Sequence, residues 1–325
     1  MASGNALSSK PDDGGKVAFL RPGDRRQTSD LLEQASKLWS SLSSLRGSTV
    51  RTGFPRIDKL LRPRSRTVTV VAARPKMFKT TLAWNIATNL AFSGRKVLWL
   101  GAEMLPEEQV AWAISRMSRI PVESILRYGM HELSLPPQQE ALLKDHEKNI
   151  TSLPMVVWPH TGLTLTELVA AATAAPYDAI FVDYVQIVGT GHSKPIDRVT
   201  AVSRSIQKLS RDLSAWWFVL SQMSREIERS DKPRLPTSAD LKESGQLEQD
   251  ADAICFLHRI GHEANKVDFL IHRNRNGPPD VSVAMLANPD YREMLEDPGP
   301  DAPPVAEPPA QEEQPTFWEQ KERYP

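Results

Sequence analysis

The chain contains a single cysteine and carries no net charge, and each feature excludes a class of protein. One thiol, Cys255, cannot form an intramolecular disulfide framework or a zinc site of the CxxC type. The 40 Lys and Arg residues balance the 40 Asp and Glu residues, so any nucleic-acid site has to be local rather than a whole basic face. No apolar run is long enough to span a membrane, and the polar amino terminus has no signal-peptide pattern. We therefore expect a cytoplasmic protein without a membrane partner.

The two ends of the chain differ in composition from its middle. Residues 1–27 are rich in Ser, Gly and charged residues without periodicity, which predicts disorder. Residues 296–325 are dominated by Pro, Glu, Asp and Ala, which predicts a disordered acidic tail. Residues 28–48 predict an amphipathic helix that packs on its own domain or on a neighbouring subunit. Its apolar stripe consists of Leu31, Leu32, Ala35, Leu38, Trp39, Leu42 and Leu45.

Strand-like and helix-like patterns alternate through most of residues 50–295, where we expect one domain. The strand-like runs are Val68–Ala72, Val97–Leu100, Met155–Trp158, Ala179–Asp183, Trp217–Ser221, Ala253–His258, Val267–His272 and Val281–Leu286. The helix-like stretches are Pro106–Arg119, Gln138–Lys148, Leu165–Ala174 and Asp197–Leu213. This alternation predicts an α/β fold with a mostly parallel central sheet flanked by helices. Ligands of such sheets bind beyond the carboxyl ends of the strands.

A phosphate-binding loop follows the first of these strand-like runs and opens into a helix-like run. The loop reads Ala73-Arg74-Pro75-Lys76-Met77-Phe78-Lys79-Thr80-Thr81. In this strand–loop–helix context, a Lys-Thr pair is typical of a Walker A motif. Backbone N–H groups and the helix N-terminus would hold the phosphates. Lys79 would reach the β- and γ-phosphates and the Thr80 hydroxyl would hold Mg²⁺, so we expect ATP and Mg²⁺ as ligands.

Phe78 stands where such a loop normally has glycine, because the backbone there passes close to phosphate. A residue with a Cβ at this place predicts a strained backbone. The substitution therefore bears on whether the loop belongs to a working ATPase or to a decayed one.

Three further strand ends carry side chains that suit phosphoryl transfer. Asp183 ends the apolar run Ala179–Asp183 in a Walker B pattern, which predicts a second group that holds Mg²⁺. Glu103 lies just past another apolar run, where a carboxylate can act as general base for water. Gln222 ends a third run and is a candidate sensor of the γ-phosphate. Each residue alone predicts a phosphoryl-transfer site only weakly. The three residues together with the phosphate-binding loop predict it more strongly.

Arg273 and Arg275 lie two residues apart at the end of a strand-like run, before a turn at Gly277-Pro278. Side chains with this spacing share a face. Arginines presented in this way can reach a neighbouring subunit's nucleotide and stabilise transition-state charge. A solvated basic turn is the alternative.

Five segments together resemble the C-terminal motor domain of DnaB-type replicative DNA helicases, which has a RecA-like ATPase fold. The resemblance covers roughly residues 50 to 295, and two of the segments, 241–252 and 274–278, are specific to this family. The segments are Thr52-Gly53-Phe54-Pro55-Arg56-Ile57-Asp58, the loop from Ala73 to Thr81, Val182-Asp183-Tyr184-Val185-Gln186, Leu241-Lys242-Glu243-Ser244-Gly245-Gln246-Leu247-Glu248-Gln249-Asp250-Ala251-Asp252, and Asn274-Arg275-Asn276-Gly277-Pro278.

The resemblance implies a ring-shaped homohexamer with ATP between subunits and single-stranded DNA in the pore. It implies that Arg275 acts in trans as an arginine finger and that Arg273 replaces a family lysine. Lys242, Glu243 and Gly245 match the loop that follows the DNA backbone. The helix at 28–48 resembles the linker helix that docks on an adjacent subunit, and a primase or a helicase loader is the implied partner.

Two departures from the family pattern bear on function. The family's amino-terminal helical domain is missing, which suggests a phage or mobile-element protein, and Phe78 replaces the loop glycine. Some RecA-like phage and plasmid ATPases resemble the chain in having Phe there. We expect an ATP-dependent, ring-forming DNA helicase or translocase of replication. The alternatives are a nucleotide-binding helicase assembly factor with little turnover and a filament-forming RecA-like recombination or repair ATPase.

Overall fold

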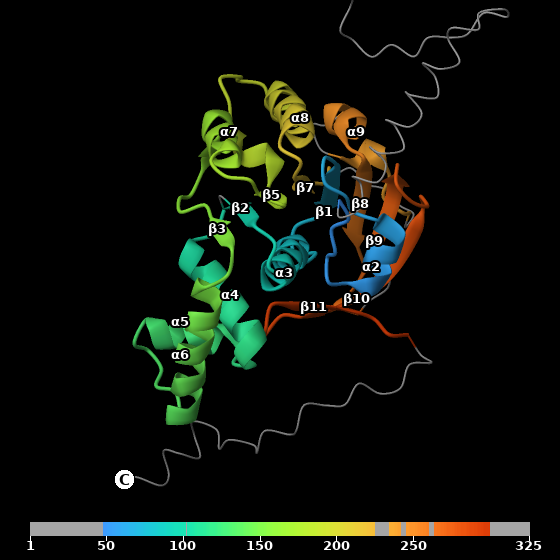
Figure 1. Cartoon of the computed structure of the whole chain (residues 1–325). Coiled ribbons are helices and arrows are strands. Elements are labelled where there is room, and N and C mark those ends of the chain that lie inside the picture. The colour runs from blue at the N-terminus through green and yellow to red at the C-terminus, as the bar shows by residue number, and fades with distance from the viewer. Residues whose placement is uncertain (1–47, 102, 225–233, 242–244, 260–262, 300–325) are drawn as a thin grey trace, which may run out of the picture. The chain divides into compact units, whose positions relative to one another are not determined.

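The computed structural model describes residues 48–101, 103–224, 234–241, 245–259 and 263–299. The predicted helix at 28–48, apart from Ser48, lies outside these residues, as do the segment 1–27 predicted to be disordered and residues 300–325 of the tail predicted at 296–325. The described part is built around a nine-stranded sheet with helices on both faces (Figure 1). The predicted α/β class, with a large and mostly parallel sheet, is confirmed.

The sheet has the strand order β11-β10-β9-β8-β1-β7-β5-β2-β3. A separate two-stranded sheet pairs β4 with β6. The strands are β1 (Val68–Ala73), β2 (Val97–Gly101), β3 (Met155–Val157), β4 (Leu163–Thr164), β5 (Ala179–Asp183), β6 (Val188–Gly189), β7 (Trp216–Gln222), β8 (Ala253–His258), β9 (Lys266–Asn274), β10 (Val281–Asn288) and β11 (Glu293–Glu296).

The two halves of the large sheet differ in strand direction. From β8 through β1, β7, β5 and β2 to β3 every neighbouring pair is parallel. From β8 through β9 and β10 to β11 every pair is antiparallel. The central parallel strands are buried along their whole length, as in β1 and β5, because helices cover both of their faces. Strand β10 alternates between buried and partly exposed residues.

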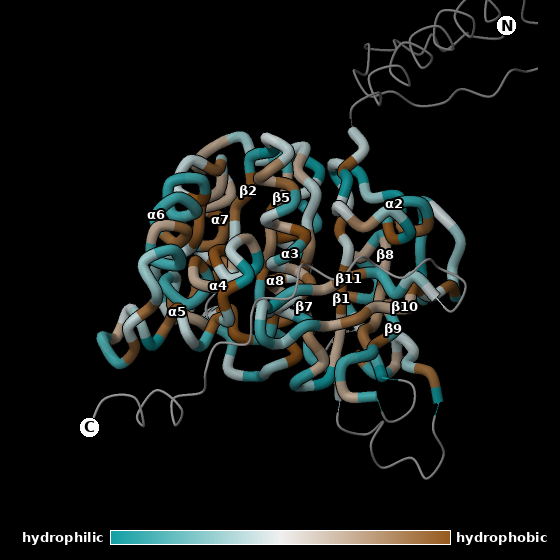
Figure 2. The backbone as a smooth tube through the Cα atoms, turned by 90° about the horizontal axis from the view of Figure 1, so that it is seen from below, coloured by the Kyte–Doolittle hydropathy of each residue, from teal (hydrophilic) through white to brown (hydrophobic). Residues whose placement is uncertain are grey.

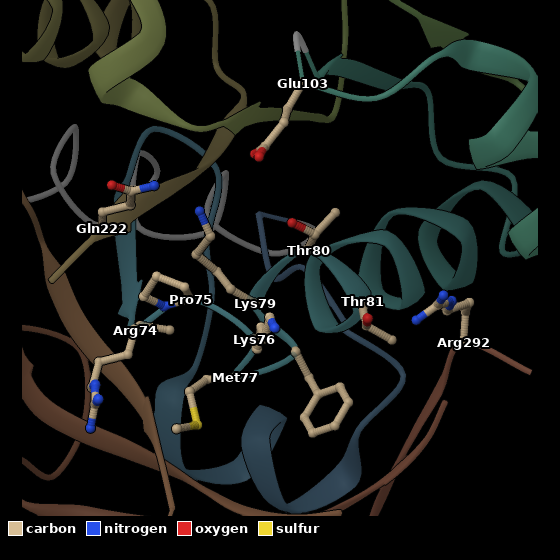
Figure 3. Close-up of a pocket in the computed structure, with 12 residues that line it drawn as sticks. Arg74, Pro75, Lys76, Met77, Lys79, Thr80, Thr81, Glu103, Gln222 and Arg292 are labelled. Carbon is tan, nitrogen blue, oxygen red and sulfur yellow. The ribbon is translucent and has the colours of Figure 1, made fainter. Parts of the chain in front are cut away.

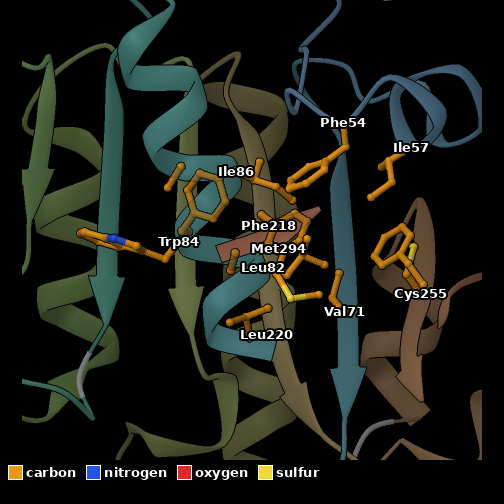
Figure 4. Close-up of a cluster of buried hydrophobic side chains, with 14 of the residues drawn as sticks. Phe54, Ile57, Val71, Leu82, Trp84, Ile86, Phe218, Leu220, Cys255 and Met294 are labelled. Atoms are coloured by element: carbon orange, nitrogen blue, oxygen red, sulfur yellow. The ribbon is translucent and has the colours of Figure 1, made fainter. Parts of the chain in front are cut away.

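The described helices cover the sheet in two layers (Figure 1). Helices α2 and α3 pack on one face, where a cluster including Phe54, Leu82, Phe218 and Met294 is buried (Figure 4). Helices α7, α8 and α9 pack on the other face. The helices are α2 (Pro55–Leu61), α3 (Lys79–Phe92), α4 (Pro106–Ser118), α5 (Val122–Gly129), α6 (Pro137–Thr151), α7 (Leu165–Thr173), α8 (Pro195–Asp212) and α9 (Gly245–Asp250), with short 3-10 turns at Val185–Ile187 and Ser238–Asp240.

The hydropathy of the chain follows this layering. Hydrophobic segments gather along the central strands and the inner sides of the helices (Figure 2). Helices α4, α5 and α6 form a third, smaller apolar cluster beyond β2. None of the described helices is both long and apolar enough to cross a membrane.

Six of the described helices and strands are absent from the sequence-based prediction: helices α2, α5 and α9 and strands β4, β6 and β11. Each spans only two to eight residues, too short for a clear hydrophobic period. Strand β11 also corrects the boundary of the predicted tail, because it extends through Glu296. The Glu296 carboxylate accepts hydrogen bonds from the backbone N–H groups of Arg56 and Ile57 at the start of α2.

Candidate nucleotide-binding site

The predicted phosphate-binding loop lies at the carboxyl end of β1 and lines a cavity of about 430 Å³ (Figure 3). Strand register brings the other predicted residues to the same edge, since Ala73 pairs with Gln222 and Gly101 pairs with Asp183. Besides the nine loop residues, the cavity is lined by Glu103, Gln222 and Arg292.

Lys79 and Asp183 form an ion pair at the carboxyl ends of these strands. The Lys79 Nζ atom lies 3.3 Å from Asp183 Oδ1, and the side chains are 12% and 4% exposed. The same ammonium lies 4.4 Å from the centre of the Tyr184 ring. Burial raises the pKa of Tyr184, and the nearby carboxylates of Glu103 and Asp183 raise it further. The peptide bond between Asp183 and Tyr184 is cis. Lys79 is thus held in place by a carboxylate and an aromatic ring.

Asp183 and Thr80 fit a magnesium site. Asp183 Oδ1 is buried and makes no aligned hydrogen bond within the described residues, although the Lys79 ammonium is close. Its lone pairs are therefore available to a cation. Thr80 lines the same cavity and offers a hydroxyl oxygen. Mg²⁺ prefers hard oxygen ligands and usually keeps several waters, so one carboxylate and one hydroxyl suffice with phosphate oxygens.

Phe78 adopts the backbone conformation that glycine would adopt. Its φ of 58° and ψ of 21° lie in the left-handed region, and Lys76 has a φ of 65°. Such a residue costs about 1–2 kcal/mol relative to a right-handed conformation. The Phe78 ring is half-buried against the hydrophobic cluster under α3, which offsets part of this cost. The Phe78 carbonyl accepts a hydrogen bond from Leu82 and begins helix α3.

Glu103 and Gln222 approach the loop from two other strands. Glu103 is exposed and follows β2, with its carboxylate directed toward the cavity (Figure 3). Gln222 ends β7, and its backbone N–H donates to Gln186 Oε1 at 3.2 Å. Gln186 in turn donates to Ser221 Oγ at 2.9 Å. The end of β7 is thereby tied to the segment that follows Asp183.

Arg273 and Arg275 lie at the amino-terminal ends of strands β1 and β8, whereas the loop follows the carboxyl end of β1. Arg275 Nη1 lies 3.1 Å from Asp252 Oδ1, and Asp252 Oδ2 accepts a hydrogen bond of 2.9 Å from the backbone of Val68. Val68 is the first residue of β1, whereas the loop follows the last. Six strand residues span about 17–20 Å. Arg273 Nη1 donates to the Glu248 carbonyl in α9 at 2.6 Å. In this structure neither arginine lines the cavity formed by the loop of its own chain.

The turn after Arg275 is fixed against helix α2. Asn274 Nδ2 donates to the carbonyls of Leu60 and Leu61, at 3.0 and 3.1 Å. A Cβ on Gly277 would lie 2.3 Å from the Leu60 carbonyl oxygen, so only glycine fits this close approach. The Asn274–Pro278 segment therefore has a structural role in presenting Arg275.

The predicted DNA-binding segment falls partly outside the described residues. Lys242 and Glu243 lie outside them, and Gly245 is the first residue of helix α9 rather than part of a loop. Leu241 pairs with Met223, next to Gln222, so the segment starts near the nucleotide edge. Upstream of Leu241 in the sequence, Arg234 donates to both carboxylate oxygens of Asp240, at 2.6 and 2.5 Å. These bonds lower the pKa of Asp240.

Two residues of the cavity region were missed by sequence reasoning. Tyr184 follows Asp183 directly, and that adjacency was the signal that could have identified it. Arg292 lies in the turn between β10 and β11, and β11 itself was not predicted. No sequence pattern connects Arg292 with a loop more than 200 residues earlier.

Residues 49–294 match the family model described as the DnaB-like helicase C-terminal domain. A probable plasmid replicative DNA helicase of Chlamydia psittaci is 32% identical over 241 residues, which are 70% of this chain and 51% of that protein. The replicative DNA helicase DnaB of Geobacillus stearothermophilus is 29% identical over 253 residues, 73% of this chain and 54% of that protein. The chain thus spans about half the length of the curated relatives it matches.

Solved structures agree on the fold. An ATPase domain superposes with a TM-score of 0.70 at 25% identity and covers 81% of this chain and 97% of its own. A DnaB-like replicative helicase, described with its interactions with primase, superposes with a TM-score of 0.70 at 24% identity. That match covers 83% of this chain and 70% of the helicase chain.

Proposed function

Because the chain belongs to the family of DnaB-like helicase C-terminal domains, we propose that it is the ATP-hydrolysing motor of a ring-forming DNA helicase. One observation carries the proposal. The groups suited to holding ATP meet at one edge of the sheet, and Arg275 is presented at the other edge. A subunit with this arrangement is complete only beside a second copy.

Within one subunit, each residue at the loop edge has a role in phosphoryl transfer. The loop N–H groups and Lys79 bind the phosphates, and Thr80 and Asp183 would hold Mg²⁺. When bound, Mg²⁺ neutralises charge on the transferring phosphoryl group. Glu103 is exposed beside the cavity, where its carboxylate can accept a proton from the attacking water. Gln222 reports the state of the γ-phosphate to the backbone of β7.

Between subunits, Arg275 completes the neighbour's site as an arginine finger, with Arg273 beside it. Its guanidinium is partly exposed, and its hydrogen bonds to Asp252 and to the Gln249 carbonyl leave it at the rim of the sheet. The long span of β1 argues against action on its own loop. This arrangement favours a closed ring of identical subunits, which we take to be a hexamer.

Single-stranded DNA is the proposed track, and Lys242, Glu243 and Gly245 are its proposed contacts. These residues connect Leu241, beside the nucleotide edge, to helix α9, which holds Arg273 and Arg275 through its carbonyls. Contacts to phosphates would be independent of sequence and sensitive to salt. We propose that residues 28–48 dock on the adjacent subunit and that a primase or a loader is the external partner.

The first test is ATP hydrolysis by the purified protein with and without single-stranded DNA, compared with Glu103→Ala. We expect turnover that DNA stimulates and that the variant loses by a factor of about 10²–10⁴, the range for general-base removal. Turnover unaffected by DNA would contradict the helicase proposal. Nucleotide binding without turnover would favour an assembly factor, and filaments rather than rings in negative-stain micrographs would favour a recombinase.

A further inference from the structure

Arg292 is a cation of the nucleotide cavity that belongs to neither the phosphate loop nor a parallel strand. It lies in the turn that joins β10 to β11 and lines the cavity on the side of Thr81 (Figure 3). Gln222 and Arg74 lie on the other side of the loop, and Glu103 approaches from a third direction. Arg292 therefore marks a separate end of the cavity.

The backbone of Arg292 is fixed to the helix that follows the phosphate loop. Asn85 of α3 is fully buried, and its Nδ2 donates to the Arg292 carbonyl at 2.9 Å. Its Oδ1 accepts from the backbone N–H of Met294 at 2.8 Å. These two bonds hold Arg292 in a left-handed conformation with a φ of 49°. One buried amide thus sets the distance between this arginine and the phosphate loop.

The next residue, Glu293, is anchored just as firmly to helix α4. Its buried carboxylate accepts hydrogen bonds from both terminal nitrogens of Arg119, and Arg116 Nε lies 3.7 Å away. Glu293 is therefore already neutralised by two other arginines. Arg292 itself forms no ion pair within the described residues, and its buried Nε has no hydrogen-bond partner among them.

The guanidinium of Arg292 stacks over an aromatic ring. Its central carbon lies 5.1 Å from the centre of the Trp112 ring in α4, within the range of a cation–π contact. Trp112 is half-buried between two apolar clusters, so the indole is a fixed platform. A planar cation supported on one face offers its other face to a second planar group.

The path of a nucleotide through the cavity decides what that group is. Lys79 marks the β- and γ-phosphates, and Glu103 lies on their side (Figure 3). The α-phosphate and the nucleoside of a bound nucleotide would then extend past the start of α3, toward Thr81 and Arg292, which line the same cavity. We propose that Arg292, supported by Trp112, is the base-binding residue of the site and that it holds the base by stacking. The proposal rests on the proposed nucleotide site.

Stacking of this kind has a consequence for specificity. Every nucleobase has a π face, so stacking favours nucleoside triphosphates over tripolyphosphate without selecting a particular base. Adenine and guanine nucleotides should then bind with similar affinity. A hydrogen-bonding pocket would instead discriminate between them, because the wrong base leaves buried polar groups unpaired.

The test measures the affinity of three probes for the full chain by calorimetry. The probes are the non-hydrolysable β,γ-imido analogues of ATP and GTP, and inorganic tripolyphosphate. We expect Arg292→Ala to weaken both nucleotides by about tenfold, within the range for loss of one base–side chain stack. Its affinity for tripolyphosphate should not change. Arg292→Lys keeps the charge and removes the planar group, so it should resemble Arg292→Ala.

Other outcomes would overturn the proposal. If Arg292→Ala weakens tripolyphosphate equally and Arg292→Lys restores binding, Arg292 is a phosphate ligand. If Arg292→Ala weakens the binding of only one purine nucleotide, Arg292 forms hydrogen bonds to the edge of that base instead of stacking on it. Trp112→Leu, which removes the platform and keeps the arginine, should reproduce the nucleotide loss. Lys79→Ala serves as the independent control: if it leaves tripolyphosphate affinity unchanged, the proposed function fails, whatever Arg292 does.

Discussion

The parallel and antiparallel halves of the sheet hold their polar side chains in different ways. In the parallel half, Asp183 and Gln222 project from the ends of buried strands, and sheet register brings them beside the loop after β1, where Lys79 begins helix α3. In the antiparallel half, Arg275 and Arg292 project from turns. Specific polar contacts fix them: Asp252 for Arg275 and Asn85 for Arg292.

The two halves are therefore sensitive to different kinds of substitution. A site built on strand ends depends on the hydrophobic core, so many single substitutions leave its geometry intact. A site built on turns depends on one or two named hydrogen bonds, each of which a single substitution removes. The antiparallel half should therefore be the part of the molecule in which point changes separate nucleotide binding from turnover.

Arg275→Ala should have the largest effect on turnover of the substitutions considered. We expect hydrolysis to fall by a factor on the order of 10³, typical of a lost arginine finger, while affinity for the ATP analogue stays within twofold. Arg95→Ala is a matched control, because Arg95 pairs with Asp178 at the same 3.1 Å. Mixing Arg275→Ala with Glu103→Ala subunits should restore part of the activity. Failure to complement would indicate that the arginine does not act in trans.

Asn85→Ala should detach the turn that carries Arg292 from helix α3. It leaves the Arg292 carbonyl and the buried Met294 N–H without partners, at about 1–3 kcal/mol for each unsatisfied group. We expect a loss of about 2–6 kcal/mol in the free energy of unfolding, measured by urea denaturation, and weaker nucleotide binding. Asn89→Ala alters the same helix, where the Asn89 amide donates to the Thr52 carbonyl and, within the described residues, does not contact the turn of Arg292, so it should leave nucleotide affinity unchanged. Equal effects would argue against the special role of Asn85.

Asp252→Asn should weaken the positioning of Arg275, the proposed arginine finger, without removing its side chain. The amide can still accept from Val68 but loses the charge that orients Arg275. We expect kcat to fall about tenfold, or about 1.4 kcal/mol in activation free energy, with KM nearly constant. Asp178→Asn removes a similar surface pair and should be silent. A change in KM alone would mean that Asp252 acts on nucleotide binding instead.

The smallest effect concerns Phe78 in the parallel half. Phe78→Gly and Phe78→Ala both lose the ring, but only glycine relieves the left-handed backbone. We expect the glycine variant to be more stable than the alanine variant by about 1 kcal/mol, a Tm difference of about 2–4 °C for a domain of this size. The same pair at Ser93, where φ is −80°, should not favour glycine. Both Phe78 variants should retain hydrolysis if the loop tolerates a side chain.

The two halves also differ in how much the sequence reveals. The parallel strands are continuous apolar runs followed by polar residues, so local pattern was enough to predict that Lys79, Glu103 and Gln222 lie around one cavity. The placement of Arg275 opposite the loop depends on β8 lying beside β1, a pairing across about 180 residues. Arg292 depends on the short strand β11 and on Asn85, and neither carries a local signal.

The lone thiol has a practical consequence for experiments on assembly. Cys255 is fully buried in β8 between β1 and β9, and burial raises the pKa of its thiol. Reactivity toward maleimides requires an accessible thiolate, so the native chain should remain unlabelled. A cysteine introduced at the exposed Gln138 of α6 would then carry one fluorophore per subunit. In the proposed ring, distances between subunits and their changes during turnover would be measurable without first removing a native cysteine.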